Sequence, residues 1–460
     1  MTHPVSVEKS SPKHYGPLNS LCLNLNLNLN LNLNLNLMKK IILPQIILAV
    51  LLTWSCTENK DNKVLKPGTP ESEQVSAERL NRIDSMIIQS IEDKWIAGAT
   101  GLIARDGKII YNRSFGVSDI DNRTPMQTDA IFRIASQTKA IVSIGLMMLF
   151  EEGKFLLDDP VSKYIPEFAN PQVIDKYNPA DTTYTTVPAK REITVRDLFT
   201  HTSGIDYAGI GSPMMNAVYS KAGIMGGFGN DRITIGDDVR ILGKQPLVHQ
   251  PGEKFTYGLN VDVIGYLVEV LSGQKLDQYL KSRIFDPLGM QDTWFYLPEE
   301  KHPRLVQVNT EDANRNVIPM PQEYVNYPLA KGTYFSGGAG LSSTTKDYAT
   351  FLQMLLNMGE YNGKRLLASR TVELITSNQI GDLNVGKNKF GLGFEITTEE
   401  GQAVLGISEG SFAWGGYFGT TYWADPEERL VCLLFMQQSP LSRGEIQNKF
   451  KAMVYQALDD

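Results

Sequence analysis

A serine and a lysine stand three residues apart, at Ser136 and Lys139, where a long apolar segment begins. Residues at this spacing share one face of a helix, and the dipole at a helix N-terminus favours developing negative charge. A serine hydroxyl is a weak nucleophile until a neighbouring group takes its proton. Lysine can be that base only when burial lowers its pKa from about 10.4 toward neutrality. The pair therefore indicates a nucleophilic serine with its base, although Ser-x-x-Lys also arises by chance on solvated helices.

Two later stretches offer further groups for the same chemistry. Tyr257 precedes a helix whose apolar face is predicted from residue 261 to 271. Its phenol either points into a cleft or packs in the core with its hydroxyl bonded. The third stretch, Trp414-Gly415-Gly416, opens a predicted strand.

Two other motifs suggest catalytic groups and are set aside. His201 lies close to a serine, but the rest of a triad is missing and Gly204 indicates a tight turn, so we interpret His201 as structural. Residues 406–410 match the G-x-S-x-G nucleophile elbow around Ser408. That motif requires a helix after the serine and a later histidine. A strand is predicted after Ser408 and the last histidine is His302, so Ser408 is not a candidate nucleophile.

The elements that must position these residues are strands near both ends of the body and helices between them. The strands are predicted at 99–105, 108–114, 391–397, 414–423 and 430–436, with Asp106-Gly107 as a two-residue hairpin turn. One helix is predicted after the N-cap Ser76, a second from 136 to 150 with a stop at Gly153, and a third from 261 to 271. A fourth follows the glycine-rich turn at 336–341 and runs through 355, and the last covers 446 to 457.

This order of elements predicts an α/β (α+β) fold in which an antiparallel sheet is flanked by helices. The α/β domain is expected to be split in sequence, with residues 76–118 and 336–460 contributing to it. Residues 119–335 are expected to form a mainly helical inserted domain that carries the Ser-x-x-Lys helix. Within that insertion, residues 205–235 are rich in glycine and methionine, which is typical of an adaptable loop. The loop either lines an acyl pocket or forms a loose surface excursion.

The N-terminal region has a different character. Asn and Leu alternate from 24 to 37, a low-complexity pattern, and we expect residues 1–37 not to belong to the natural protein. Residues 38–55 resemble an export signal, because two lysines precede an apolar stretch too short to span a bilayer.

Cys56 follows a small serine, as in a bacterial lipobox, which predicts lipid attachment at this cysteine; a plain cleaved signal or a simple N-terminal anchor is the alternative. Residues 56–75 are polar, contain two prolines and are predicted to be a flexible tether. Together these features predict an exported protein, periplasmic or on the cell surface and anchored as a lipoprotein.

Composition limits the partners. The chain carries 44 Lys and Arg against 51 Asp and Glu, a formal net charge of −7. An acidic chain with no basic run argues against nucleic-acid binding. Contact with the membrane is expected through the N-terminal lipid anchor only. Cys432 lies in an apolar run and is expected to be a buried thiol without a disulfide.

The three stretches, with the His201-to-Gly204 turn and the Pro251-Gly252 lead-in to Tyr257, resemble the serine β-lactamase-like superfamily. This superfamily comprises class C β-lactamases, DD-peptidases and family VIII carboxylesterases. The resemblance covers most of residues 75–460 and implies that Ser136 attacks the substrate, with Lys139 as proton acceptor and Tyr257 as a second general base. It further implies an oxyanion hole from the backbone N–H groups of Ser136 and Tyr417, and no metal or cofactor. Gly415 and Gly416, which lack side chains, and Trp414 would then contact the substrate.

Two departures favour the family VIII esterase type. Leu259 stands where the lactamases carry the asparagine of Tyr-x-Asn, and Trp414 stands where they carry Lys or His. We therefore expect an exported serine hydrolase that cleaves a small-molecule ester, with Leu259 also at the substrate. The alternatives are a DD-peptidase, amidase or β-lactamase on peptide or β-lactam substrates, and a non-catalytic cell-envelope sensor or binding module with the same fold.

Overall fold

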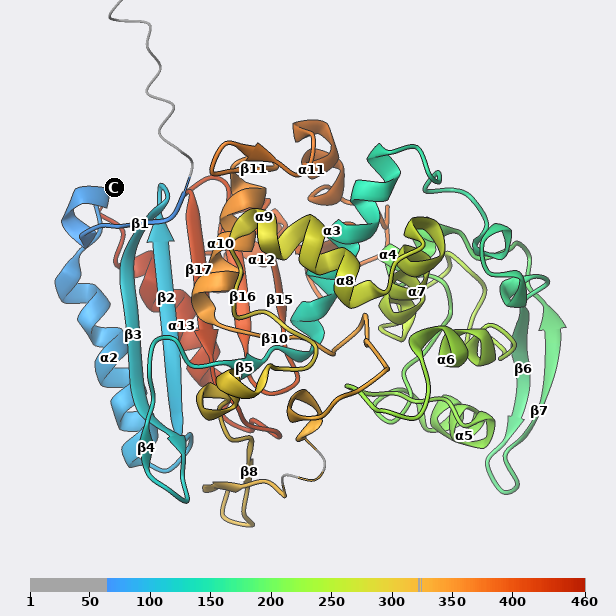
Figure 1. Ribbon diagram of the computed structural model, residues 1–460, viewed down its shortest axis with the longest axis horizontal. Coiled ribbons are helices and arrows are strands. Elements are labelled where there is room, and N and C mark those ends of the chain that lie inside the picture. Colours follow the sequence, from blue (N-terminus) through green and yellow to red (C-terminus); the bar gives the residue numbers. More distant parts are fainter. Residues whose placement is uncertain (1–63, 322, 324, 460) are drawn as a thin grey trace, which may run out of the picture. The chain divides into compact units, whose positions relative to one another are not determined.

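A sheet of nine strands joins the two ends of the described chain (Figure 1). The computed structural model describes residues 64–321, 323 and 325–459. In spatial order the strands are β1 (Lys66–Pro67), β3 (Lys108–Asp119), β2 (Gly98–Arg105), β17 (Leu430–Phe435), β16 (Thr421–Asp425), β15 (Phe412–Gly415), β14 (Glu395–Ile396) and β13 (Lys389–Phe390), with β4 (Thr124–Pro125) paired to β3. Strand β1 runs parallel to β3, and the other pairs are antiparallel. The predicted fold class is confirmed.

Helices cover both faces of this sheet (Figure 1). On one face, α2 (Ala77–Glu92) and α13 (Glu445–Gln456) pack together over a core that includes Ile83, Phe450 and Trp423. The predicted N-cap of α2 is confirmed, because the Ser76 side chain accepts a hydrogen bond from the Arg79 backbone. On the other face, α10 (Thr345–Leu356) contacts β2, β16 and β17.

Helix α3 (Thr138–Glu151) follows the nucleophile candidate and is buried over its whole length up to Leu149. It packs against α7 (Asn260–Ser272) and α8 (Leu276–Leu280). A Cβ on Gly145 would stand 2.8 Å from a Leu280 methyl carbon, so glycine allows α3 and α8 to approach closely. The predicted stop at Gly153 agrees with its φ of +70°.

The other helices and four short strand pairs complete the described fold. The helices are α4 (Val195–Phe199), α5 (Pro213–Ala222), α6 (Ile235–Leu242), α9 (Asp286–Leu288), α11 (Ser369–Ile375) and α12 (Glu399–Leu405). The small strand pairs are β5 (Phe132–Arg133) with β10 (Ser342–Ser343), β6 (Gln172–Asn178) with β7 (Thr183–Pro188), β8 (Asn309–Glu311) with β9 (Val317–Pro319), and β11 (Glu360–Tyr361) with β12 (Lys364–Arg365).

Two of the predicted strands are wrong as single elements. Residues 391–397 contain only the short β14, because the chain turns between β13 and β14 and Gly393 takes a φ of +96° beside Ser143. The strand predicted at 414–423 is instead the hairpin of β15 and β16, with Gly419 at a φ of +83° in its turn. Glycine takes these backbone conformations without the strain that other residues meet. The Asp106-Gly107 hairpin is found as predicted, with both residues at positive φ.

Part of the predicted tether belongs to the folded body. Strand β1 pairs with β3, a 3₁₀ turn covers Pro70–Glu73, and the buried Glu73 side chain pairs with Lys108. The prediction of a flexible segment up to residue 75 is therefore corrected from residue 66 onward. The leader at 1–37, the signal peptide at 38–55 and Cys56 lie outside the described residues. None of the helices within the described residues is long and apolar enough to cross a membrane.

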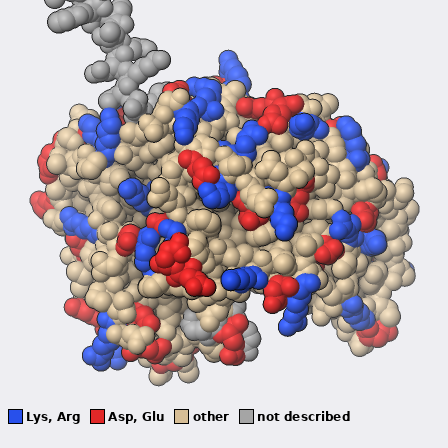
Figure 2. Space-filling view, viewed as in Figure 1, with Lys and Arg blue, Asp and Glu red and all other residues tan. Residues whose placement is uncertain are grey.

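Charged side chains of both signs are interspersed over the face of the molecule in Figure 2. Many charged side chains of the described residues form exposed ion pairs, such as Arg429 with Asp106 and Lys190 with Glu253. Exposed pairs contribute little to stability, roughly 0–1 kcal/mol each.

Candidate active site

Ser136 lies in a 3₁₀ turn, Ala135–Gln137, that leads directly into α3. Ala135 immediately before it has a φ of +43°, which is unusual for a residue with a side chain. Strained backbone of this kind persists where the surrounding structure enforces it and is common at functional sites. The turn places Ser136 Oγ 3.2 Å from the Nζ atom of Lys139, as the spacing of the two residues predicts.

The Lys139 side chain is buried and has three acceptors around its nitrogen. Nζ donates to Ser136 Oγ at 3.2 Å, to the Tyr207 hydroxyl at 3.3 Å and to the Gly338 carbonyl at 2.7 Å. Since an ammonium group has three hydrogens to donate, this arrangement satisfies the charged form of lysine completely.

The Lys139 pKa corrects one expectation from the sequence. Burial is the largest single influence and lowers the pKa, as expected. The nearby Tyr207 and Tyr257 side chains and the Asp262 carboxylate act in the opposite direction, and together they raise the pKa above its ordinary value. Lys139 is therefore an ammonium group in the resting site and not the free base that the sequence predicts.

Tyr257 is the second neighbour of the nucleophile candidate. Its hydroxyl donates to Ser136 Oγ at 2.6 Å and accepts the indole N–H of Trp414 at 3.4 Å. Lys139 Nζ lies 4.7 Å from the centre of the Tyr257 ring. The predicted residues Ser136, Lys139, Tyr257 and Trp414 thus meet at one point, although they come from three separate parts of the chain.

His201 supports Tyr257 from behind. The two ring centroids are 4.9 Å apart, and His201 Nδ1 accepts from the Asn260 side-chain amide at 3.0 Å. Burial and the nearby Lys139 hold the pKa of His201 well below its usual value, so the ring is neutral. The backbone carbonyl of His201 also accepts from the N–H of Thr256, the residue before Tyr257.

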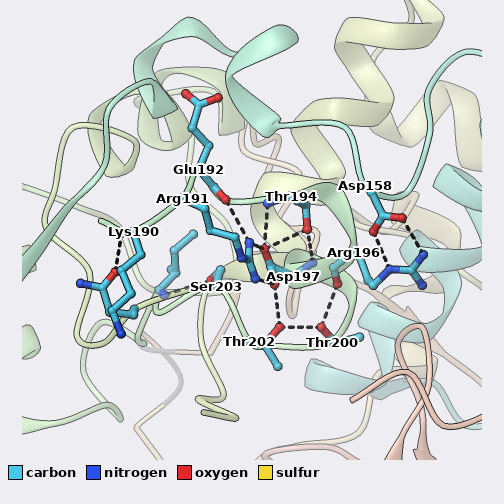
Figure 3. A network of polar contacts seen from close by, with 12 residues as sticks. Asp158, Lys190, Arg191, Glu192, Thr194, Arg196, Asp197, Thr200, Thr202 and Ser203 are labelled. Carbon is cyan, nitrogen blue, oxygen red and sulfur yellow. Dashed lines mark hydrogen bonds and ion pairs between the residues drawn. The ribbon is translucent and has the colours of Figure 1, made fainter. Parts of the chain in front are cut away.

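A polar network fixes the turn that carries His201 (Figure 3). Asp197, in α4, accepts from the Arg191 guanidinium, from the backbone and hydroxyl of Thr194, and from the Thr202 hydroxyl. Thr202 in turn pairs with the Thr200 hydroxyl at 2.9 Å. Because these bonds hold both sides of His201, they also fix the position of Tyr257.

Ser136 opens into a cavity of about 650 Å³. Its walls are mostly apolar and aromatic, which is typical of small-molecule sites. Among the described residues that line it, Glu395 is the one with a formal charge. The lining residues are Ala135, Ser136, Tyr207, Ala208, Gly209, Ile210, Gly226, Gly227, Phe228, Tyr257, Ala339, Glu395, Trp414, Gly415 and Tyr417.

The loop at 205–235 forms one wall of this cavity, through Tyr207 to Ile210 and Gly226 to Phe228. Of the two interpretations of this loop, the structure therefore favours the pocket over a loose surface excursion. Tyr207 is a site residue that sequence reasoning missed, because a lone tyrosine in a glycine-rich loop has no distinctive spacing.

Two predicted substrate-binding residues lie elsewhere. Leu259 is 2% exposed, precedes α7 and packs in the main core, so the prediction that it contacts substrate is wrong. Gly416 backs onto the Ile134 carbonyl, where a Cβ would come within 2.5 Å, and it supports the strand end from behind. Gly415 and Tyr417 line the cavity, with the Tyr417 side chain half exposed at 50%.

Ser408 is separate from this site. It lies between α12 and β15, is buried, and is not among the residues that line the cavity. A helix precedes it and a strand follows it, the reverse of the order that a nucleophile elbow requires.

The fold and this constellation define a serine β-lactamase-type protein, a class of serine hydrolases and acyltransferases. The chain belongs to the beta-lactamase family, whose model matches residues 83–455. Esterase EstB of Burkholderia gladioli is 29% identical over 379 residues, which cover 77% of this chain and 89% of the esterase. A putative D-alanyl-D-alanine carboxypeptidase of Escherichia coli strain K12 is 29% identical over 413 residues, 84% of this chain and 86% of that protein.

A solved structure extends the comparison. EstCE1, described as a hydrolase with promiscuous acyltransferase activity, superposes with a TM-score of 0.69 at 25% identity. The match covers 82% of this chain and 98% of EstCE1. The predicted membership of the serine β-lactamase-like superfamily is thereby confirmed.

Proposed function

We propose that this protein is a carboxylesterase-type serine hydrolase that acts through an acyl-Ser136 intermediate. The observation that carries the proposal is the position of Ser136 Oγ, 2.6 Å from the Tyr257 hydroxyl and 3.2 Å from Lys139 Nζ at the wall of an apolar cavity. A serine hydroxyl becomes a nucleophile when a neighbouring group can take its proton, and the Tyr257 oxygen lies within reach of that proton.

The geometry supports a proton relay through Tyr257. In the resting site Tyr257 donates to Ser136, so its proton must first turn from Ser136 Oγ to the leaving oxygen of the bound ester. Ser136 Oγ then bonds to the acyl carbon while its proton passes to the Tyr257 oxygen. The Tyr257 proton passes at the same time to the departing alkoxide, so an alcohol leaves and Tyr257 is unchanged. Water then attacks the acyl carbon, gives a proton to Tyr257, and the Tyr257 proton returns to Ser136 as the acid is released.

Hydrogen-bond donors around Ser136 complete this mechanism. The Lys139 ammonium donates to Ser136 Oγ and stabilises negative charge that develops there during attack. The backbone N–H groups of Ser136 and Tyr417, which belong to two residues lining the cavity, would bind the carbonyl oxygen as negative charge develops on it during attack. In this scheme lysine stabilises charge and tyrosine moves the proton.

The cavity wall favours esters over β-lactams. A penicillin or cephalosporin carries a carboxylate beside its ring, and a cationic side chain would hold that carboxylate by a charge-assisted hydrogen bond. Here Trp414 offers one neutral N–H, and that N–H already faces Tyr257. An uncharged ester needs no such anchor, and its apolar part can pack on the indole.

A substrate panel tests the proposal. Wild type and Ser136→Ala would be compared on short-chain p-nitrophenyl esters, nitrocefin and a peptide ending in D-alanyl-D-alanine. We expect ester turnover that disappears in Ser136→Ala, with weak or absent nitrocefin hydrolysis. Preferred release of D-alanine would replace the esterase by the peptidase alternative. No reaction with any of the three, and no labelling by a fluorophosphonate, would favour the non-catalytic alternative.

We also propose that the protein is exported and anchored through a lipid on Cys56. The proposal rests on the sequence alone, on the signal-like residues 38–55 and on the small residue before Cys56. Mass spectrometry of the exported protein tests it, because an unmodified Cys56 thiol would exclude the anchor. Detection of any peptide from residues 1–37 would show that the leader is made.

A further inference from the structure

Gly338 connects Lys139 to a buried carboxylate. Its carbonyl accepts from Lys139 Nζ at 2.7 Å, and its N–H donates to Asp262 Oδ1 at 3.2 Å. The hydroxyl of Ser336 donates to the same oxygen at 2.9 Å. Asp262, from the first turn of α7, therefore holds the turn at 336–338 and with it the carbonyl that faces Lys139.

The position at 338 has no room for a side chain. A Cβ there would stand 2.4 Å from Asp262 Oδ2 and 3.4 Å from the Tyr207 hydroxyl. Glycine thus lets the carboxylate, the phenol and the ammonium group gather around one residue of the backbone. This close packing brings Asp262 and Tyr207 to the residue whose carbonyl accepts from Lys139.

Asp262 has an unusual environment for an acid. Asp262 is 3% exposed, and its Oδ2 atom has no hydrogen-bond partner among the described residues. A buried carboxylate is costly unless a positive charge or several donors compensate it. Burial is the largest influence and raises the pKa of Asp262 above its ordinary value, although Lys139 and the donors Ser336 and Gly338 act to lower it.

Among the titratable groups around Gly338, we take Lys139 and Asp262 as the two charges that compensate each other. His201 is neutral because of burial, and the phenols of Tyr207 and Tyr334 have raised pKa values. Tyr257 contacts Lys139 from the side of Ser136. Asp238 is the next carboxylate, and it accepts from the Tyr334 hydroxyl and from the Met225 backbone and not from Gly338.

We propose that Asp262 is a positioning residue for acylation: it fixes the Gly338 carbonyl against Lys139 and, as an ionised carboxylate, keeps Lys139 in its ammonium form. The inference rests on the proposed function, because it assumes that Lys139 assists Ser136. Asp262 does not touch the substrate or the reacting atoms. It acts on the reaction through the charge and the position of Lys139.

The charge can be removed while the hydrogen bonds are kept. In Asp262→Asn the amide oxygen still accepts from Ser336 and Gly338, so the turn is preserved while the negative charge is lost. Loss of a nearby opposite charge lowers the pKa of an ammonium group. The alkaline limb of the pH profile for fluorophosphonate labelling should therefore move to lower pH, by about one unit or more.

A matched control lies on the same helix. Glu269 in α7 is a partly buried carboxylate that accepts from the Leu276 backbone, and Glu269→Gln should leave the profile unchanged. Asp262→Ala should also lose the hold on Gly338 and label slowly at every pH. Ser336→Ala, which removes one donor and disfavours ionised Asp262, should shift the alkaline limb in the same direction by a smaller amount.

The outcomes separate the two proposals. If wild type is not labelled at Ser136, the proposed function fails. If wild type is labelled but Asp262→Asn has the same alkaline limb, Asp262 carries no compensating charge and this inference is overturned. Should Asp262→Asn fail to fold, as judged by thermal unfolding, Ser336→Ala decides: an unchanged limb in that variant contradicts the inference as well.

Discussion

The hydroxyl of Tyr257 lies 2.6 Å from Ser136 Oγ, although the two residues are 121 positions apart in the chain. Three elements meet at this contact: the turn before α3, the segment before α7 and the end of β15, whose Trp414 N–H faces the same phenol. The Tyr257 ring is packed between His201, Tyr207 and Trp414. The phenol is therefore held in position by aromatic packing, and its hydroxyl is free to serve Ser136.

Tyr257→Phe should keep this packing and lose the reaction. Phenylalanine retains the ring but removes the oxygen that relays the proton, and general acid–base groups contribute roughly 10²- to 10⁴-fold in rate. We expect kcat/KM for p-nitrophenyl acetate to fall by at least about 100-fold, with a thermal unfolding midpoint close to that of wild type. Activity within a few-fold of wild type would assign the proton transfer to another group.

Tyr207→Phe should have a smaller effect. It removes one of the three acceptors of Lys139 but leaves the Gly338 carbonyl and Ser136 in place. A single hydrogen bond to a charged group is worth about 1.5–3 kcal/mol, so a fall of about tenfold to 100-fold in kcat/KM is expected. Tyr455→Phe, which alters a half-buried tyrosine bonded to Asp425 away from the cavity, is the control and should affect stability alone.

Sequence patterns found the parts of the site that follow strong local rules. Ser136 and Lys139 are fixed by helical spacing, and Tyr257 and Trp414 by their order along the chain and a family resemblance. Tyr207 carries no such signal. Asp262 does carry one that sequence reasoning did not use, because an acid among Val261, Val263 and Ile264 in an apolar helix requires a buried partner.

The errors in the predicted fold also have physical causes. Apolar runs predict strands well but do not show where glycine turns divide them, which is why β15 and β16 were merged. Strands β6 and β7 were missed because β7 is exposed along its whole length and has no apolar face. Alternation of apolar and polar residues signals a strand only when one face is buried.

Trp414→Lys should shift the substrate preference. The new ammonium group could hold the carboxylate of a β-lactam by a charge-assisted bond, which is about twice as strong as a neutral one. The ratio of nitrocefin acylation to ester hydrolysis should rise, even if deacylation stays slow. Trp414→Phe, which keeps an apolar face without adding charge, should leave nitrocefin acylation unchanged, and an equal rise in both variants would refute the role of charge.

Gly415→Ala and Gly416→Ala should separate substrate access from folding. The nearest atom to a Cβ at 415 is the Thr420 carbonyl oxygen at 3.5 Å, an ordinary contact, and this residue lines the cavity. A Cβ at 416 would meet Thr420 Oγ1 at 2.2 Å and the Ile134 carbonyl at 2.5 Å. Gly415→Ala should therefore fold normally but react slowly, whereas Gly416→Ala should lower the unfolding midpoint. Equal unfolding midpoints for the two variants would contradict this account.

Asp347→Asn should change how stability depends on pH. Burial raises the pKa of Asp347 to about 6, so the folded state binds this proton more tightly than the unfolded state. Its stabilising contribution is present below the unfolded pKa of about 4 and is lost as pH rises through about 6. Between pH 4 and 7, wild type should lose on the order of 2 kcal/mol of unfolding free energy relative to the variant. A constant difference between the two proteins in chemical denaturation would disprove it.

The most direct measurement is the site of covalent labelling by a fluorophosphonate. Wild type, Ser136→Ala, Ser408→Ala and Lys139→Ala would be treated with the probe, digested and mapped by mass spectrometry. The account predicts one adduct, on Ser136, in wild type and in Ser408→Ala, no adduct in Ser136→Ala and strongly reduced labelling in Lys139→Ala. An adduct on Ser408, or undiminished labelling without Ser136, would contradict it.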